Sequence, residues 1–408
     1  MPHISQRAIA MPASPIRKLV PLAEDAKKRG TKVYHLNIGQ PDIETPHAFY
    51  EAIRKADLTV LAYSHSAGNE SLRNKIAEYY TRLNLPLNHQ QVLVTTGASE
   101  ALAFTFMSCL NPGDEIIVPE PFYANYISFA LTAGVKILPL TTHIEEDFDL
   151  PPIEAFEALI TPRTKAIMIC NPGNPTGILY PKASLEKLKD IVLKHDLYLF
   201  SDEVYREFVY DGQKHYSVLG FEGLEQHAIV VDSISKRFSA CGARIGCVVT
   251  RNKEVMSAML KYAQARLSPP TMGQIGAEAV YDLPQSFYDG VIAEYDARRK
   301  FVMAALQEIE GVFCPHIGGA FYAMVKLPVD NAETFCRWML QEFSYKGATV
   351  MMAPANGFYA SPELGIDQVR IAYVLNRTDL AAAMDCLAAG LKAYSGKVLA
   401  ANPQSTHA

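Results

Sequence analysis

The sequence predicts an α/β protein with two parts: a large domain with a mostly parallel, seven-stranded sheet flanked by helices, and a smaller α+β domain. Two observations lead to this fold class. The middle of the chain alternates short apolar runs with helical patterns, which is typical of parallel sheets. Most of those runs also lack polar alternation, as expected of strands whose two faces are both covered by helices.

Seven apolar runs are the candidate strands of the large sheet. They are Val92–Val94, Ile116–Val118, Val135–Leu140, Ala166–Cys170, Leu197–Phe200, Ala228–Val231 and Ile245–Val249. Only thirteen residues separate the last two runs, and they show no helical period, which is marginal for a parallel crossover. We therefore expect the last strand to run antiparallel to its neighbours.

Helical patterns lie between several of these strands. In the stretch SLEKLKDIVLKH, four apolar residues share one helical face, and Ser184 is a candidate N-cap. The four are Leu185, Leu188, Ile191 and Val192.

The last third of the chain changes character. A long helical stretch from about 284 to 311 precedes two strand-like segments, GGAFYAMVKL and VRIAYVL, with a helical pattern between them. We therefore expect residues 46–290 to form the large domain and residues 291–408 to form the small domain, to which residues 1–45 also contribute.

Composition and charge narrow the functional classes. The chain has 408 residues, a formal net charge of −5 and a pI near 6.1, which argues against nucleic acid or an anionic membrane as the main partner. No apolar run reaches the ~18 residues of a membrane span, and the N-terminus lacks a signal peptide's apolar region. The seven cysteines show no metal-ligand spacing, so we expect a cytoplasmic protein with reduced cysteines and no metal site.

Ligands of open α/β sheets bind beyond the carboxyl ends of the strands, so the residues that follow each strand are the first candidates for a site. After Val92–Val94, TTGASEAL is a glycine turn into a helix with Ser99 in its first turn, which suits an anion. After Ala166–Cys170 comes NPGNPTG, in which Asn171 or Asn174 could also simply hold the turn together.

Two further strand ends carry reactive groups. Leu197–Phe200 is followed by Asp202 and Tyr205, although Ser201 or Asp202 could instead cap a helix. The stretch DSISKRFSACGARIG, residues 232–246, contains three serines, Lys236 and two arginines. A partly desolvated lysine near arginines has a lowered pKa and can attack a carbonyl, whereas the simpler alternative is a solvated basic loop.

Together these strand ends suit pyridoxal phosphate. The predicted edge offers an anion site for a phosphate, a carboxylate for a ring nitrogen and a lysine for an aldehyde. NPGNPTG, SDEVY and SISKRFSACGARIG, in that order, resemble the signature of the fold-type I pyridoxal-phosphate aminotransferases of class I/II, the aspartate aminotransferase-like group. Asp202 follows Asn174 by 28 positions, Lys236 follows Asp202 by 34, and Arg244 follows Lys236 by eight. The likeness extends from NIGQPD to VRIAYVLNRTDL.

The resemblance implies a role for each residue around the cofactor. Lys236 would hold it as a Schiff base and shuttle a proton, and Asp202 would keep the pyridine nitrogen protonated. Asn174 and Tyr205 would bond the phenolic oxygen, and Tyr123 would stack on the ring. The phosphate would be held by Gly97, Ala98, Ser99, Ser233 and Arg244.

The resemblance also implies a substrate site and a partner subunit. Arg370 would grip the α-carboxylate of an L-amino acid or a 2-oxo acid, with Asn174 beside it, and Gly39 would let the backbone approach that carboxylate closely. Tyr63 would reach the phosphate of a neighbouring subunit, which implies a two-fold homodimer. The reaction would be amino-group transfer by a ping-pong cycle.

The choice of substrate stays open at this stage. Ser99 stands where one aspartate-using branch of the family has a lysine that recognises the second carboxylate, and Arg17 and Lys18 are nearby alternatives. Four aromatic residues leave a neutral or aromatic side chain equally open. They are Phe122, Tyr123, Phe358 and Tyr359.

Other reactions on the same scaffold are the alternatives to transfer. Elimination at Cβ or Cγ by a lyase would use the same Lys236, Asp202 and Arg370. A non-catalytic, cofactor-sensing module is disfavoured because Lys236 and Asp202 are both present.

Overall fold

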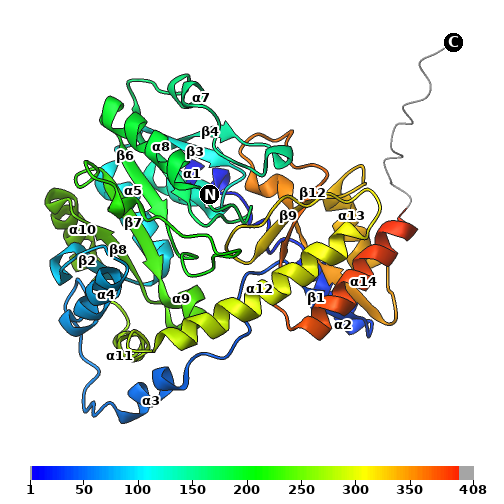
Figure 1. Ribbon diagram of the computed structural model, residues 1–408, viewed down its shortest axis with the longest axis horizontal. Coiled ribbons are helices and arrows are strands. Elements are labelled where there is room, and N and C mark those ends of the chain that lie inside the picture. The colour runs from blue at the N-terminus through cyan, green and yellow to red at the C-terminus, as the bar shows by residue number, and fades with distance from the viewer. Residues whose placement is uncertain (1, 395–408) are drawn as a thin grey trace.

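The computed structural model describes residues 2–394, which fold around a seven-stranded sheet (Figure 1). The strands are β2 (Val92–Thr95), β3 (Glu115–Glu120), β4 (Lys136–Thr141), β5 (Thr164–Cys170), β6 (Tyr198–Asp202), β7 (Ala228–Ser233) and β8 (Gly246–Thr250), in the order β2-β8-β7-β6-β5-β3-β4. β8 pairs antiparallel with both β2 and β7, and the other pairs are parallel. All seven predicted strands and the antiparallel direction of the last one are confirmed.

Helices cover both faces of this sheet. One face packs against α5 (Gly97–Cys109), α6 (Asn125–Ala133) and α10 (Lys253–Arg266). The other packs against α4 (Glu70–Arg82), α8 (Lys182–His195) and α11 (Thr271–Val280). Within β5, Met168 belongs to the first core and Ile167 to the second. Because successive side chains of a strand point to opposite faces, both sides of each strand must be apolar, which explains the runs without polar alternation.

The predicted apolar face of α8 is confirmed, but its predicted cap is wrong. Leu185, Leu188, Ile191 and Val192 are all buried. The helix already begins at Lys182, with Pro181 in the cap position and no side-chain cap, so Ser184 lies inside the first turn. Proline's fixed φ suits the entry to a helix, and it moved the boundary upstream of the serine.

The chain ends of the described region pack together in a second body. β1 (Lys32–His35) pairs in parallel with β10 (Ala348–Met351), and β9 (Tyr322–Lys326), β12 (Gln368–Ala372) and β11 (Ala353–Pro354) form an antiparallel sheet. The helices α2 (Val20–Lys28), α13 (Ala332–Gln341) and α14 (Arg377–Ala393) lie beside them, and the long α12 (Gln285–Gln307) runs from the large sheet to this body (Figure 1). The domain boundaries at residues 45 and 290 stay predictions.

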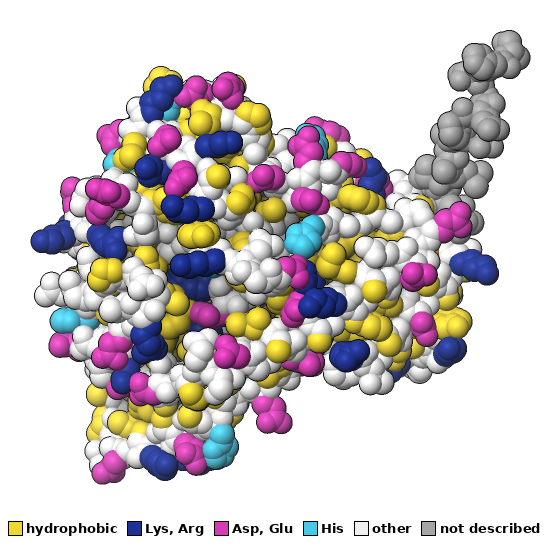
Figure 2. All heavy atoms as spheres, viewed as in Figure 1, with side chains coloured by type: hydrophobic (Ala, Val, Ile, Leu, Met, Phe, Trp, Pro, Cys, Tyr) yellow, Lys and Arg dark blue, Asp and Glu magenta, His cyan; other side chains and the backbone are white. Residues whose placement is uncertain are grey.

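The remaining helices are short. They are α1 (Gln6–Ala10), α3 (His47–Lys55), α7 (Ile153–Glu157) and α9 (Ile234–Arg237). Within residues 2–394 no helix has the length and apolar character to cross a membrane. Acidic and basic side chains are mixed over the face shown in Figure 2, in keeping with the small net charge.

Candidate active site

A cavity of about 360 Å³ opens beside the carboxyl ends of β5, β6 and β7. Most of the residues predicted for the site line it. These are Gly39, Ala98, Ser99, Tyr123, Asn174, Asp202, Tyr205, Ser233, Lys236, Arg244 and Arg370. Two predicted residues do not line it. Gly97 lies against the Arg244 guanidinium, and the Tyr63 side chain is 78% exposed on the surface.

Lys236 projects from α9, the single helical turn that follows β7. Ser233 caps this turn, because its Oγ accepts a hydrogen bond of 3.0 Å from the Ser235 backbone N–H. The Lys236 Nζ donates a hydrogen bond of 2.7 Å to the Gly39 carbonyl across the cavity. Burial lowers the pKa of Lys236, and the positive charges of Arg370 and Arg244 lower it further. The alternative of a solvated loop is therefore wrong for this lysine.

Asp202 ends β6 as a buried carboxylate. Its Oδ2 accepts 2.8 Å from the Tyr126 hydroxyl, and its Oδ1 accepts 3.3 Å from the Val204 N–H. No helix begins after β6 until a short turn at 218–220, so the capping alternative for Ser201 or Asp202 is wrong. Burial raises the pKa of Asp202 to about 6. A cation placed in the cavity would stabilise the ionised form of such a carboxyl.

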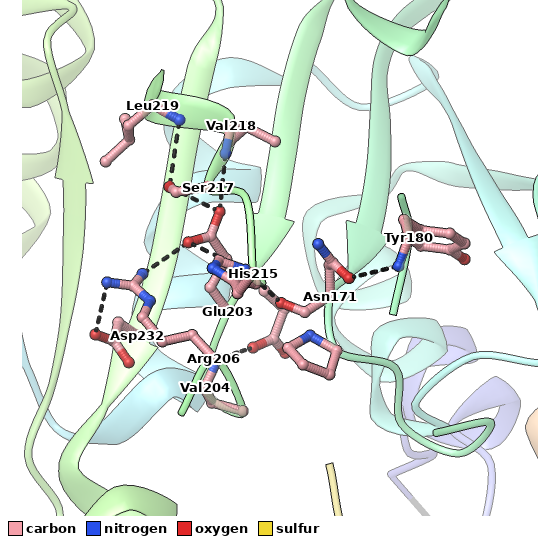
Figure 3. Close-up of polar contacts among 12 residues, drawn as sticks. Asn171, Tyr180, Glu203, Val204, Arg206, His215, Ser217, Val218, Leu219 and Asp232 are labelled. Carbon is pink, nitrogen blue, oxygen red and sulfur yellow. Dashed lines mark hydrogen bonds and ion pairs between the residues drawn. The ribbon is translucent and has the colours of Figure 1, made fainter. Parts of the chain in front are cut away.

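The two asparagines of NPGNPTG have different roles. The Asn171 Oδ1 accepts 3.0 Å from the Tyr180 N–H, so this residue holds the turn together (Figure 3). Asn174 instead lines the cavity, where its Oδ1 accepts 2.9 Å from Nη1 of Arg370. Its Nδ2 lies 3.5 Å from the Tyr205 hydroxyl. The structural interpretation of this motif is therefore confirmed for Asn171, whereas the site role of Asn174 stays a prediction.

Arg370 lies on β12 with 1% of its surface exposed. Its guanidinium carbon is 4.5 Å from the centre of the Tyr322 ring and 4.8 Å from that of Phe358. Its polar contacts are neutral oxygens, those of Asn174 and of the Asn37 carbonyl, and its Nε has no hydrogen-bond partner. Burial lowers the pKa of Arg370. A buried guanidinium with only neutral contacts is a ready site for a carboxylate from a ligand.

The anion site predicted at the start of α5 is a candidate that the local geometry allows. Gly97 has φ +75°, and a Cβ there would overlap the Arg244 guanidinium, so only glycine permits the close approach. The Arg244 side chain otherwise contacts the Thr96 and Cys241 carbonyls, at 3.4 and 3.0 Å. The free N–H groups of the helix start, this guanidinium and the hydroxyls of Ser99 and Ser233 together suit a phosphate.

Several cavity residues could not be predicted from motifs. The Tyr322 hydroxyl lies 2.8 Å from that of Tyr205, although 117 positions separate the two residues. A Cβ on Gly39 would overlap this same hydroxyl. Cys241, and Ser14 and Ile16 of the N-terminal segment, also line the cavity.

Comparison with known proteins agrees with this geometry. Residues 31–387 match the family model for aminotransferase class I and II. The aspartate aminotransferase of Bacillus subtilis is 32% identical over 91% of this chain and 94% of its own. Aromatic-amino-acid aminotransferase 2 of Thermococcus litoralis is 30% identical over 95% and 98%. The structure of an alanine aminotransferase from Pyrococcus furiosus has a TM-score of 0.87 and 32% identity, over 96% of this chain and 100% of its own. The chain therefore belongs to the class I and II aminotransferases, the fold-type I family that its strand-end motifs resemble.

Proposed function

We propose that this protein uses pyridoxal 5'-phosphate to move the α-amino group of an L-amino acid to a 2-oxo acid in a ping-pong cycle. The observation that carries the proposal is the convergence of a lysine, a buried carboxylate and a buried arginine on one cavity. When bound, the cofactor supplies an aldehyde for the amino group and a ring that withdraws electrons from the substrate α-carbon. Asp202 would face the ring nitrogen, and Arg244 with the start of α5 would hold the phosphate.

The protein's own groups then orient the substrate and move one proton. Arg370 binds the α-carboxylate through its guanidinium, with Asn174 holding that guanidinium in place. The lowered pKa of Lys236 favours a neutral amine, which can accept the proton of the substrate α-carbon. The Gly39 carbonyl holds the amine in this direction. The relatives named above are all aminotransferases, which favours transfer over elimination.

A half-reaction tests the proposal. A single L-amino acid, added without an oxo acid, should convert the bound cofactor once and change its visible absorbance. Lys236→Ala should abolish this conversion, because the proton acceptor is lost. Lys182→Ala, on the exposed start of α8, is the matched control and should convert at the wild-type rate. Conversion by Lys236→Ala at that same rate would contradict the proposal, and continuous release of ammonia would indicate the lyase.

The pKa of Asp202 gives a pH-dependent prediction for the cofactor-free protein. The folded-state pKa, about 6, lies above the ordinary value of 3.8, so burying the ionised carboxylate destabilises the fold above pH 6 and not below pH 4. Asp202→Asn should therefore raise the free energy of unfolding by about 2–3 kcal/mol at pH 8 and by much less at pH 4. Denaturant unfolding at the two pH values measures this. A variant no more stable than the wild type at pH 8 would show that the carboxylate is not desolvated.

Arg17 leads us to propose an acidic side chain for the preferred substrate. It is exposed and lines the mouth of the cavity, whereas Lys18 forms a 2.5 Å ion pair with Glu333. Burial raises the pKa of Tyr123, and the charges of Arg370 and Arg17 oppose that rise, so Arg17 lies within electrostatic reach of the cavity wall. Its segment is fixed by a 2.8 Å hydrogen bond from the Asn37 side chain to the Ile16 carbonyl.

Substrate kinetics test Arg17. Arg17→Met should raise KM for L-aspartate or L-glutamate about tenfold, the effect of losing one charge-assisted hydrogen bond. KM for L-alanine and L-phenylalanine should change less than about twofold. Lys18→Met is the control and should leave all these values unchanged, since it removes only a surface ion pair. An equal rise in KM for acidic and neutral substrates would contradict the proposed role of Arg17.

We also propose a cytoplasmic homodimer. Apolar side chains are exposed along the segment that contains Tyr63, in the connection after α10 and at the start of α11. They are Leu58, Val60, Leu61, Tyr63, Leu267 and Met272, exposed by between 36% and 78%. The segment and α11 are joined by a 2.8 Å hydrogen bond between Gln274 and Ser64. A second copy of the chain would cover this surface and receive Tyr63 in its phosphate site.

Mixing two impaired variants tests the shared site. In a hybrid dimer of Lys236→Ala and Tyr63→Ala, one site would regain both the lysine and the partner tyrosine. After unfolding and refolding together, the mixture should be more active than either variant refolded alone, while sedimentation shows a dimer. Activity equal to the average of the separate variants would show that Tyr63 does not act in the neighbouring site.

A further inference from the structure

The side chain that follows Lys236 points away from the cavity. Arg237 has 2% of its surface exposed and enters a network of charged groups buried behind the active site. Its Nη2 donates to both carboxylate oxygens of Asp232, at 3.1 and 2.9 Å. Asp232 lies on β7, two positions before the first residue of the turn α9, and Arg237 ends that turn. This pair therefore closes a clamp across the one turn that carries Lys236.

Further contacts hold the clamp in place. The Asp232 Oδ1 also accepts 2.7 Å from the Ser233 N–H, and the Arg237 guanidinium stacks 4.3 Å from the centre of the Tyr79 ring. Burial alone would raise the pKa of Asp232, but the guanidinium groups of Arg237 and Arg206 hold it below its ordinary value. The clamp is thus an ionised pair in a buried site.

The network continues to the strand that carries Asp202. Arg206 donates 2.7 Å to Glu203 and lies 3.8 Å from Asp232, so it links the two carboxylates (Figure 3). Glu203 also accepts 3.0 Å from the Ser217 hydroxyl and 3.1 Å from the Val218 N–H. Burial lowers the pKa of the adjacent His215 to about 3, so that ring adds no charge.

Residues that are adjacent in the chain therefore point in opposite directions, one side chain toward the cavity and the next toward the buried network. Asp202 lines the cavity and Glu203 enters the network, and Lys236 lines the cavity while Arg237 enters the network. A shift of the network would move the reactive groups, since each pair shares a stretch of backbone. Displacements of about 1 Å cost on the order of a hundredfold in rate when reacting groups must meet in a fixed geometry.

We propose that Arg237 is a positioning residue: its paired bonds to Asp232 fix the turn that aims the Lys236 amine into the cavity. The inference rests on the proposed role of Lys236. A lysine at position 237 would keep the charge, but it would lose the planar guanidinium that stacks on the Tyr79 ring while it bonds Asp232.

The test compares Arg237→Lys with Arg299→Lys. Arg299 is also 2% exposed and binds both oxygens of Asp211, at 2.7 and 2.6 Å, but it lies on α12 and does not line the cavity. Arg237→Lys should lower kcat by about tenfold to a hundredfold with KM nearly unchanged. Arg299→Lys should leave kcat unchanged, although both variants lose thermal stability.

A second measurement does not depend on turnover. In the cofactor-free protein, labelling of Lys236 by trinitrobenzenesulfonate, followed across pH by peptide mass spectrometry, reports the pKa of its amine. A loosened turn lets the amine reach water, so Arg237→Lys should move the labelling midpoint upward by about one pH unit. Arg299→Lys should not move it. We expect this shift of the labelling midpoint even if the proposed function is wrong. The shift would be absent if the clamp does not position Lys236.

A second variant, in which both residues of the clamp become neutral, provides the test if Arg237→Lys does not fold. Asp232→Asn combined with Arg237→Gln removes both charges of the clamp together, so neither is left buried without the other, which is the main danger of breaking a buried ion pair. This double variant should show the same fall in kcat and the same upward shift. A folded Arg237→Lys or double variant with the kcat and labelling profile of Arg299→Lys would overturn the proposal.

Discussion

The structure depends on burying charged groups without ionic partners around one cavity, at the carboxyl ends of β5, β6 and β7. Asp202 is held by a hydroxyl and a backbone N–H, and Arg370 by neutral oxygens and two aromatic rings. Burying a charge in this way is costly unless something else compensates it. A ligand with a cationic ring nitrogen and a carboxylate would supply both missing partners. Its binding would therefore offset the free-energy cost of burying the two charged groups. The positions of Asp202 and Arg370 also determine where such a ligand must lie.

The opposite side of the same strand ends is rich in buried ion pairs. Glu203 and Asp232 are paired with Arg206 and Arg237, and Tyr79 and Tyr80 contribute ring faces at 4.3 Å. The ion pairs on that side tie the ends of the two strands together, whereas the charged groups of the cavity lack ionic partners and are ready to bind a ligand. Adjacent side chains at the end of β6 and in the turn α9 point to the two sides, so one short stretch supplies both a reactive group and its support.

Local patterns in the sequence were enough for the large sheet and for much of the cavity. Short apolar runs predicted each of its strands, and the motifs at the strand ends contained Asn174, Asp202 and Lys236. Contacts between distant segments were beyond prediction, because no local pattern encodes that Tyr322 meets Tyr205 or that Tyr126 binds Asp202. The short strands β1, β10 and β11 were missed because they owe their place to pairing between separate segments of the chain. Arg237 was visible beside Lys236, but only the fold shows that it faces Asp232.

Reduction of the cofactor-loaded protein with borohydride tests the central claim most directly, because it makes the bond between a lysine and a carbonyl cofactor permanent. Peptide mass spectrometry then identifies the lysine that carries the added mass. We expect one modified peptide, containing Lys236, and no modification of Lys18 or of the exposed lysines on α8. A modified peptide without Lys236, or no modified peptide in a protein that binds the cofactor, would contradict it.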